Sequence, residues 1–113
     1  MILINQDQAA SIKESLGTDT LKELVEIYTT CAQNTLKEIS QHIVTGDYAM
    51  LKVAAHTLKG SSATFGAQGM QMLAKQIEGF ALENNMVALN DCYRGMEEIL
   101  PETITALYQA YGI

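Results

Sequence analysis

The feature that most constrains the fold of this chain is a helical repeat of apolar residues, which runs through nearly its whole length. Apolar side chains recur three and four positions apart, and this spacing places them on one side of an α-helix. Apart from residues 2–4, no segment alternates or runs in β-branched residues as a strand does. The pattern predicts an all-α protein. Its longest stripe comprises Leu21, Leu24, Val25, Tyr28, Cys31, Ala32, Leu36, Ile39 and Ile43.

A short helix and a long helix come first in the chain. Asn5 with Gln8 forms a capping-box pattern that begins the short helix, and Gly17 closes it. Thr20 with Glu23 repeats the capping pattern at the start of the long helix. We therefore expect Asn5 and Thr20 to be the residues that cap these two helices.

Three more helices follow, with short connections. Asp47 is expected to cap the third, which ends at Gly66, and a fourth follows directly as far as residues 84–85. The last runs over about 86–111 and contains Pro101, which is expected to kink or restart it. Because short connections favour antiparallel neighbours, we predict an antiparallel up-down four-helix bundle with a short N-terminal capping helix. Residues 1–113 are expected to form a single domain.

Composition excludes several classes of function. The chain has 13 acidic and 7 basic residues and a net charge of -6, the wrong sign for tracking a phosphate backbone, so we expect no nucleic-acid partner. No apolar run approaches the roughly 18 to 20 residues of a membrane-spanning helix, so no direct membrane contact is expected. Cys31 and Cys92 fit no metal-ligand spacing and lie in helical patterns. We expect both in the core of a protein of the reducing cytoplasm.

His56 is predicted to lie on the outward side of the third helix. At about 100° per residue, the apolar residues of this helix gather on the side opposite the histidine. The imidazole is therefore expected to be exposed, with a lysine on each flank. Its neighbours on the outward side are Ala49, Lys52, Val53, Lys59, Gly60 and Ala63.

Gly60 is an unfavourable residue in the interior of a helix. It costs about 1 kcal/mol relative to alanine. Close packing against a neighbouring helix would explain a glycine, but Gly60 lies only about 40° from His56, where no neighbouring helix is expected. We interpret it as a bare patch that lets the surface of another protein approach the imidazole.

Two residues of the fourth helix lie at nearly the same height as His56. The third and fourth helices form a hairpin, in which Glu78 is displaced from His56 by about 3 Å along the axis, and Lys75 is comparably placed in height. Geometry leaves both candidates open. A carboxylate that accepts the Nδ1 proton would leave Nε2 with a free lone pair, and a neutral imidazole of this kind is a nucleophile near pH 7.

Several nearby residues suit a phosphoryl group on such a histidine. Lys59, one turn away, can stabilise the dianionic group. Ser61 and Ser62 turn at least about 120° from His56, so we expect them to be small packing residues beneath it.

The segment HTLKGSSATFGAQGMQMLAKQIE, residues 56–78, resembles the signature of histidine-containing phosphotransfer (HPt) domains from two-component phosphorelays. The shared pattern is a histidine, then an apolar residue, lysine, glycine and two small residues, with further apolar, glycine and acidic positions behind them. The length of the chain and its predicted bundle also agree with this family. The matching residues are His56, Leu58, Lys59, Gly60, Ser61, Ser62, Phe65, Gly66, Met70 and Glu78.

The resemblance implies a phosphocarrier. His56 would accept a phosphoryl group from the aspartate of one receiver domain and pass it to the aspartate of another. Lys59 would stabilise the phosphoryl group, Gly60 would leave room for the receiver, and Glu78, rather than Lys75, would orient the imidazole.

Partners and setting follow from the same resemblance. The expected partners are response-regulator receiver domains and a hybrid sensor histidine kinase, of which the chain would be a standalone carrier or the C-terminal domain. We expect a cytoplasmic monomer without cofactor, metal or ATP site of its own. Beside His56, the docking surface is expected to include Lys52, Gly60 and Ala63.

Four alternatives have less support. The phosphoaccepting domain of a chemotaxis-type histidine kinase shares the motif, but the linker and kinase modules that follow it there are absent here. An autonomous enzyme lacks support because the chain contains no nucleotide-binding glycine loop. A metal site on His42 and His56 would join different helices without convergent ligands. A purely structural bundle would not explain why His56, Lys59 and Gly60 share an outward face.

Overall fold

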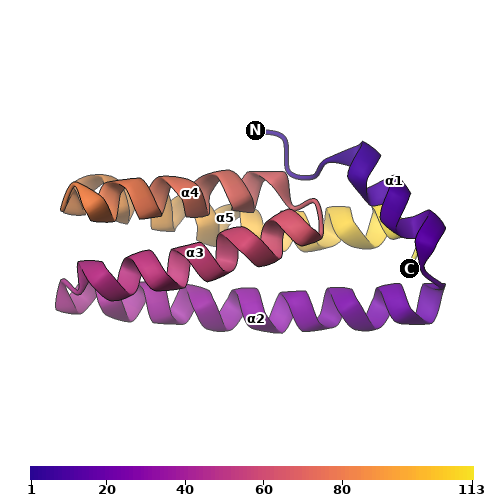
Figure 1. Cartoon of the computed structure of the whole chain (residues 1–113), viewed down its shortest axis with the longest axis horizontal. Helices are drawn as coiled ribbons and strands as arrows, with labels where there is room; N and C mark the ends of the chain where they lie inside the picture. Colours follow the sequence, from indigo (N-terminus) through magenta and orange to yellow (C-terminus); the bar gives the residue numbers. More distant parts are fainter.

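Five α-helices and no strand make up the computed structural model, which describes residues 1–113 (Figure 1). The all-helical prediction is confirmed. The helices are α1 (Gln6–Ser15), α2 (Thr18–Thr45), α3 (Tyr48–Thr64), α4 (Gln68–Leu82) and α5 (Met86–Tyr111).

The four longer helices form the predicted antiparallel up-down bundle. α2 packs against α3 and α5, and α4 packs against the same two helices, so that the bundle is closed (Figure 1). The 28 residues of α2 correspond to about 42 Å of helix, which is the longest dimension of the molecule, 42 Å. Because α3 and α4 are much shorter, α1 lies across the end of the bundle where they stop and packs against α5 (Figure 1).

Side-chain caps begin three of the helices. Asn5, Asp47 and Asn85 each accept, through Oδ1, a hydrogen bond of 3.1 Å from the backbone N–H three residues later. The caps predicted at Asn5 and Asp47 are confirmed. Such a bond satisfies one of the free donors at a helix N-terminus and stabilises the helix by about 1 kcal/mol.

The cap predicted at Thr20 is wrong. α2 begins two residues earlier, at Thr18, and its N-cap Gly17 makes no side-chain hydrogen bond. The N–H of Leu21 donates to the carbonyl of Gly17 at 2.9 Å, so Thr20 already lies in the first turn. Only residues 16 and 17 separate α1 from α2, and a connection this short leaves no room for a later start.

Pro101 does not restart the last helix. α5 is continuous from Met86 to Tyr111 with the proline inside it, so that part of the prediction is wrong. Proline removes one backbone donor, but Leu100 and Thr103 beside it are buried in the core. Most of the stability of a helix in a folded protein comes from the packing of its buried side, so α5 continues through Pro101 although one backbone hydrogen bond is lost.

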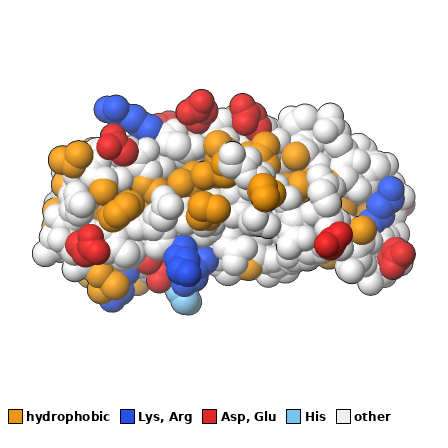
Figure 2. Space-filling model, turned by 90° about the horizontal axis from the view of Figure 1, so that it is seen from above, with side chains coloured by type: hydrophobic (Ala, Val, Ile, Leu, Met, Phe, Trp, Pro, Cys, Tyr) orange, Lys and Arg blue, Asp and Glu red, His pale blue; other side chains and the backbone are white.

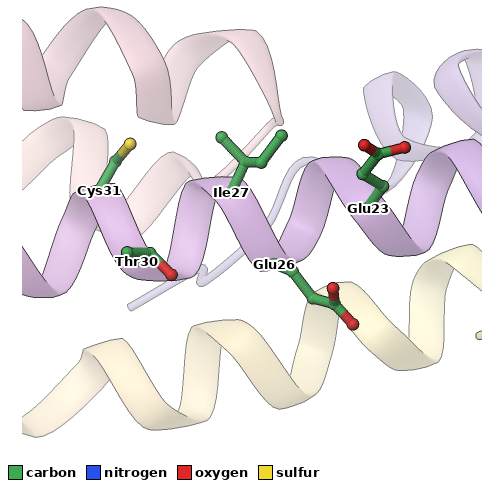
Figure 3. Close-up of a pocket in the computed structure, with 5 residues that line it drawn as sticks. All are labelled: Glu23, Glu26, Ile27, Thr30 and Cys31. Atoms are coloured by element: carbon green, nitrogen blue, oxygen red, sulfur yellow. The ribbon is translucent and has the colours of Figure 1, made fainter.

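Cys92 is buried as predicted, but Cys31 is exposed, and its assignment to the core is wrong. Cys31 follows Tyr28 at helical spacing, yet it lies about 90° from the centre of the buried stripe of α2. Figure 3 shows Glu23, Ile27 and Cys31 following one another along one side of α2. The hollow of about 310 Å³ beside them is lined by α2 alone, so it is an open helix surface and not a cleft.

Side chains from α1 and α5 secure the turn between α3 and α4. Gln8 donates from Nε2 to the carbonyl oxygens of Ala63 at 2.6 Å and Thr64 at 3.2 Å. The hydroxyl of Tyr111 donates to the carbonyl of Phe65 at 3.0 Å. The Gln8 side chain thus serves the end of α3 instead of completing the predicted capping box at the start of α1.

Candidate functional site

His56 projects outward from the middle of α3. The opposite side of this helix is held in the core by Leu51, Ala54, Ala55 and Leu58, all of which are buried. The His56 side chain is 73% exposed. The burial of one apolar side of the helix thus fixes the direction of the imidazole, as the helical angles predicted.

Glu78 reaches across from α4 and lies between the imidazole and an ammonium group. Its Oε1 is 3.4 Å from His56 Nδ1 and 2.7 Å from Lys59 Nζ. The side chains of Glu78 and Lys59 are 22% and 30% exposed, and the Oε1 atom itself is buried. Lys75, the other candidate from the hairpin geometry, is exposed and forms no ion pair. The structure therefore brings together three of the predicted site residues around one carboxylate oxygen.

The electrostatics of this cluster favour an ionised Glu78. Burial by itself raises the pKa of the carboxyl, but the contact with Lys59, together with the charges of Lys59 and His56, outweighs it, and the pKa of Glu78 is lowered. An ionised carboxylate can only accept hydrogen bonds. It therefore favours the imidazole tautomer that carries its proton on Nδ1, with the lone pair on Nε2 directed away from Glu78.

A hollow of about 340 Å³ adjoins the imidazole. It is lined by Lys52, Val53, His56, Thr57 and Glu78, so it lies between α3 and α4. Two of these residues, Lys52 and Glu78, were expected at the site beside His56. Sequence reasoning did not single out Thr57, whose hydroxyl donates within α3 to the carbonyl of Val53 at 3.2 Å. The one sequence signal that could have identified Thr57 is its position directly after the histidine.

Gly60 and Ala63 lie farther along α3 and differ in their surroundings. Gly60 is exposed, and a Cβ atom built on it would meet nothing within 4 Å. The surface beside the imidazole is therefore open, and no neighbouring helix packs against this glycine. Ala63 is half-buried, and its carbonyl oxygen is bound by Gln8. It lies about 10 Å beyond His56 along the helix axis, at the contact with α1.

The two serines of the motif lie beneath the site, as expected. Ser62 is completely buried, and its hydroxyl is 2.7 Å from that of Tyr28 on α2. Burial raises the pKa of Tyr28 to about 12, although the bond to Ser62 lowers it. Ser61 donates to the carbonyl of Leu58 within its own helix. The hydrogen bond between Tyr28 and Ser62 connects α3 to α2. Sequence reasoning missed this bond because the two residues are far apart in the chain.

The charge of α3 differs from that of the other helices. It contains Lys52 and Lys59 and no acidic residue, in a chain with a net charge of -6. Figure 2 shows a histidine and lysine or arginine side chains projecting together at one edge, while acidic side chains and further lysine or arginine side chains lie elsewhere on the visible face. The surface around His56 therefore attracts an anionic partner more strongly than the protein as a whole does.

A third hollow, of about 340 Å³, lies between α4 and α5. Cys92 lines it together with Leu73, and its Sγ is 3.3 Å from the Leu73 carbonyl oxygen. Burial raises the pKa of the Cys92 thiol to about 11. The thiol is therefore protonated near pH 7 and is a poor nucleophile.

No group of three histidine, cysteine, aspartate or glutamate side chains is placed to hold a metal ion. His42 and His56 belong to α2 and α3, respectively, and do not converge on a common site. None of the helices has the length and apolar character needed to cross a membrane.

Comparison with known proteins gives one family and two relatives. The family model described as the Hpt domain matches residues 23–110. The phosphorelay protein LuxU of Vibrio vulnificus strain YJ016 is 33% identical over 85 residues, which cover 75% of this chain and 74% of the relative. LuxU of Vibrio vulnificus strain CMCP6 gives the same values. No solved structure matches the chain.

Proposed function

The chain belongs to the Hpt domain family, and from this premise we propose that it is a phosphorelay intermediate that carries a phosphoryl group on His56 between receiver domains of two-component systems. One observation supports His56 as the carrier more than any other. Its Nδ1 faces the carboxylate of Glu78 at 3.4 Å, while the remainder of the ring is exposed. This arrangement leaves Nε2 accessible to another protein.

The proposed transfer needs no proton donor or acceptor in the attacking step. The Nε2 lone pair attacks the phosphorus of the receiver's aspartyl phosphate, and an Nε2–P bond forms. The bond between phosphorus and the aspartyl oxygen breaks, and the carboxylate leaves with its electron pair. The ring keeps its Nδ1 proton and gains positive charge, which the ionised Glu78 stabilises. The reverse step, on a second receiver, returns the imidazole to its neutral form.

The other predicted residues have roles that fit this reaction. The open surface at Gly60 gives a receiver room to bring its aspartate to Nε2. Lys59 holds Glu78 through their ion pair, and so keeps the carboxylate beside Nδ1. Lys52 and Ala63 complete the proposed docking surface, and the lack of acidic residues on α3 favours an anionic receiver surface.

We also propose a setting for this carrier. It acts without an ATP site of its own, as a monomer whose residues 1–113 form one domain. The contact of Gln8 with the end of α3 supports including the segment that precedes the family match. The proposed donor is the receiver of a hybrid sensor histidine kinase. The proposed compartment is the cytoplasm, where the two free cysteines would stay reduced.

The experiment that tests this function uses a receiver domain carrying radiolabelled phosphate. The parent chain is expected to acquire a label that is labile to acid and stable to alkali, as phosphohistidine is. His56→Gln is expected to acquire none. His42→Gln, which removes the other histidine, is the matched control and is expected to behave as the parent does. Equal labelling of His56→Gln and the parent would refute the proposal.

A further inference from the structure

A second glycine lies inside a helix beside the site. Gly79 directly follows Glu78 in α4 and is three residues from the end of that helix. Like Gly60, it costs about 1 kcal/mol relative to alanine in a helix. A Cβ atom built on Gly79 would meet nothing within 4 Å, and its φ is not in the left-handed region. Neither close packing nor the backbone conformation therefore requires a glycine at this position.

Gly79 lies on the outward side of α4. At about 100° per residue, it is roughly opposite the buried side of this helix. The turn between α3 and α4 is centred on Gly66, which is 13 residues after Val53 and 13 residues before Gly79. Val53 and Gly79 therefore lie at nearly the same height on two neighbouring helices. The buried residues that define the angle are Gly69, Met70, Leu73, Ala74, Ile77 and Ala81.

The hollow beside His56 lies between these two helices. Of the three hollows on the surface of the protein, it is the only one that the imidazole lines. Val53 lines it from α3 and is 56% exposed, although it is apolar. Leu82 lies four residues after Glu78, on the same side of α4, and is 67% exposed. The hollow thus has an exposed apolar residue on each of its two helices, with Gly79 between Glu78 and Leu82.

A receiver domain that reaches His56 must cover more than the imidazole. A standard interface buries about 800 Å² on each partner, which corresponds to a circle of roughly 16 Å radius. The axes of packed helices are about 8 to 10 Å apart, and six residues of helix add about 9 Å. A footprint centred on His56 therefore includes Gly79 and Leu82 on α4 as well as the outward side of α3.

From these observations we propose that the receiver straddles the groove between α3 and α4. Gly79 gives the receiver clearance on α4, and Val53 and Leu82 are its apolar contacts on the two sides of the groove. The inference rests on the proposed function, because the occupant is the receiver that exchanges a phosphoryl group with His56. It extends the docking surface that was predicted on α3 to a second helix.

The charge of α3 favours a receiver over a second copy of this chain in the groove. In a symmetric pair the same surface meets itself, so the lysines of α3 would face those of the other copy. α3 has no acidic residue that could balance them. The aspartyl phosphate of a receiver is an anion and is attracted by the same lysines.

The test compares labelling by a phosphorylated receiver with labelling by potassium phosphoramidate, which requires no docking. In the second reaction Nε2 attacks the phosphorus of zwitterionic phosphoramidate, the Nε2–P bond forms, the P–N bond breaks, and ammonia leaves with the electron pair. Gly79→Gln is expected to slow transfer from a dilute receiver about tenfold and to leave labelling by phosphoramidate unchanged. Its melting temperature should not fall, because glutamine is a better helix former than glycine.

Thr105→Gln is the matched control for added bulk. Thr105 is exposed on α5, which packs against α2 and α4, so a longer side chain there should leave the transfer rate unchanged. Leu82→Ala measures the apolar contact and is expected to raise the receiver concentration at half-maximal rate about threefold, with the same maximal rate. Gln76→Ala is its control, because Gln76 is exposed on α4 but lines the hollow shared with α5.

Three outcomes would overturn the inference. Transfer to Gly79→Gln at the rate of the parent would exclude the clearance role. Equal slowing of both labelling reactions in Gly79→Gln would place its effect at His56 itself and not at docking. A parent dimer that Leu82→Ala dissociates in sedimentation equilibrium would assign the groove to a second copy of the chain. If a receiver transferred no label to the parent, that result would instead contradict the proposed function.

Discussion

Replacing Ser62 with alanine should destabilise the protein, because the change leaves the hydroxyl of Tyr28 buried without a partner. Tyr28 and Ser62 are 1% and 0% exposed, and their hydroxyl oxygens are 2.7 Å apart. Removing one partner of a buried hydrogen bond costs about 1 to 3 kcal/mol. Water cannot replace the lost partner at this depth, so we expect a loss of about 2 kcal/mol in the free energy of unfolding.

Tyr28→Phe removes the bond from the other side. Once Tyr28 lacks its hydroxyl, Ser62→Ala no longer orphans a buried group, so the double variant should lose less than the sum of the two single losses. The difference is expected to be about 1 kcal/mol. A coupling of this size would show that the hydrogen bond, and not the packing of each side chain, connects α2 to α3 beneath the site.

Urea unfolding followed by circular dichroism measures these free energies, and a loss of about 2 kcal/mol should lower the midpoint by about 1 M. Ser61→Ala is the matched control, since Ser61 is only half-buried and its hydroxyl donates within its own helix. It should cost less than about 0.5 kcal/mol. Strictly additive losses in the Tyr28 and Ser62 variants, or equal losses in the two serine variants, would refute the reasoning.

Three other variants test separate parts of the structure. The lowered pKa of Glu78 means that its ionised form stabilises the folded state fully above about pH 4.5 and loses this effect as the pH falls through the folded-state pKa. The difference in unfolding free energy between the parent and Glu78→Gln should therefore shrink as the pH is lowered from 6 to 3, and a constant difference would argue against the ion pair. Gly60→Gln should slow phosphoryl transfer without lowering the melting temperature, because a side chain there meets open space; an unchanged rate would exclude the clearance role. Gln8→Ala should lower the unfolding free energy by about 1 to 2 kcal/mol, because two carbonyls of α3 lose their donor. Transfer to His56 should keep its rate in Gln8→Ala, and a slower rate would mean that α1 also affects the site.

The parts of the fold that were predictable from sequence depend on local backbone chemistry. Gly46 ends α2 in the left-handed region at φ 68°, and Asp47 then caps α3, as their residue types indicate. Cys31 and Thr20 were misjudged because their surroundings depend on other helices. Cys31 lies at the margin of the stripe, where burial depends on how far neighbouring helices extend. Thr20 is not the N-cap of α2, because α2 begins only two residues after α1 ends and its N-cap is Gly17.

The candidate site was also predictable where it depends on the geometry of one helix or one hairpin. Helical angles placed His56 and Gly60 outward, and the hairpin placed Glu78 within reach of the imidazole. They did not show that Lys59 pairs with Glu78, because a long, flexible side chain can meet several partners on its surface. The Tyr28–Ser62 contact joins residues 34 positions apart. Contacts of this kind depend on how whole helices pack, and no local pattern encodes them.

The most direct test of the central claim is a relay reconstituted from two receiver domains and this chain. The first receiver carries the labelled phosphate, and the label on the second is measured over time with and without the chain. We predict that the parent chain transfers label to the second receiver, and that His56→Gln leaves it at the level found without the chain. Equal label on the second receiver with the parent and with His56→Gln would contradict the claim that His56 carries the phosphoryl group between them.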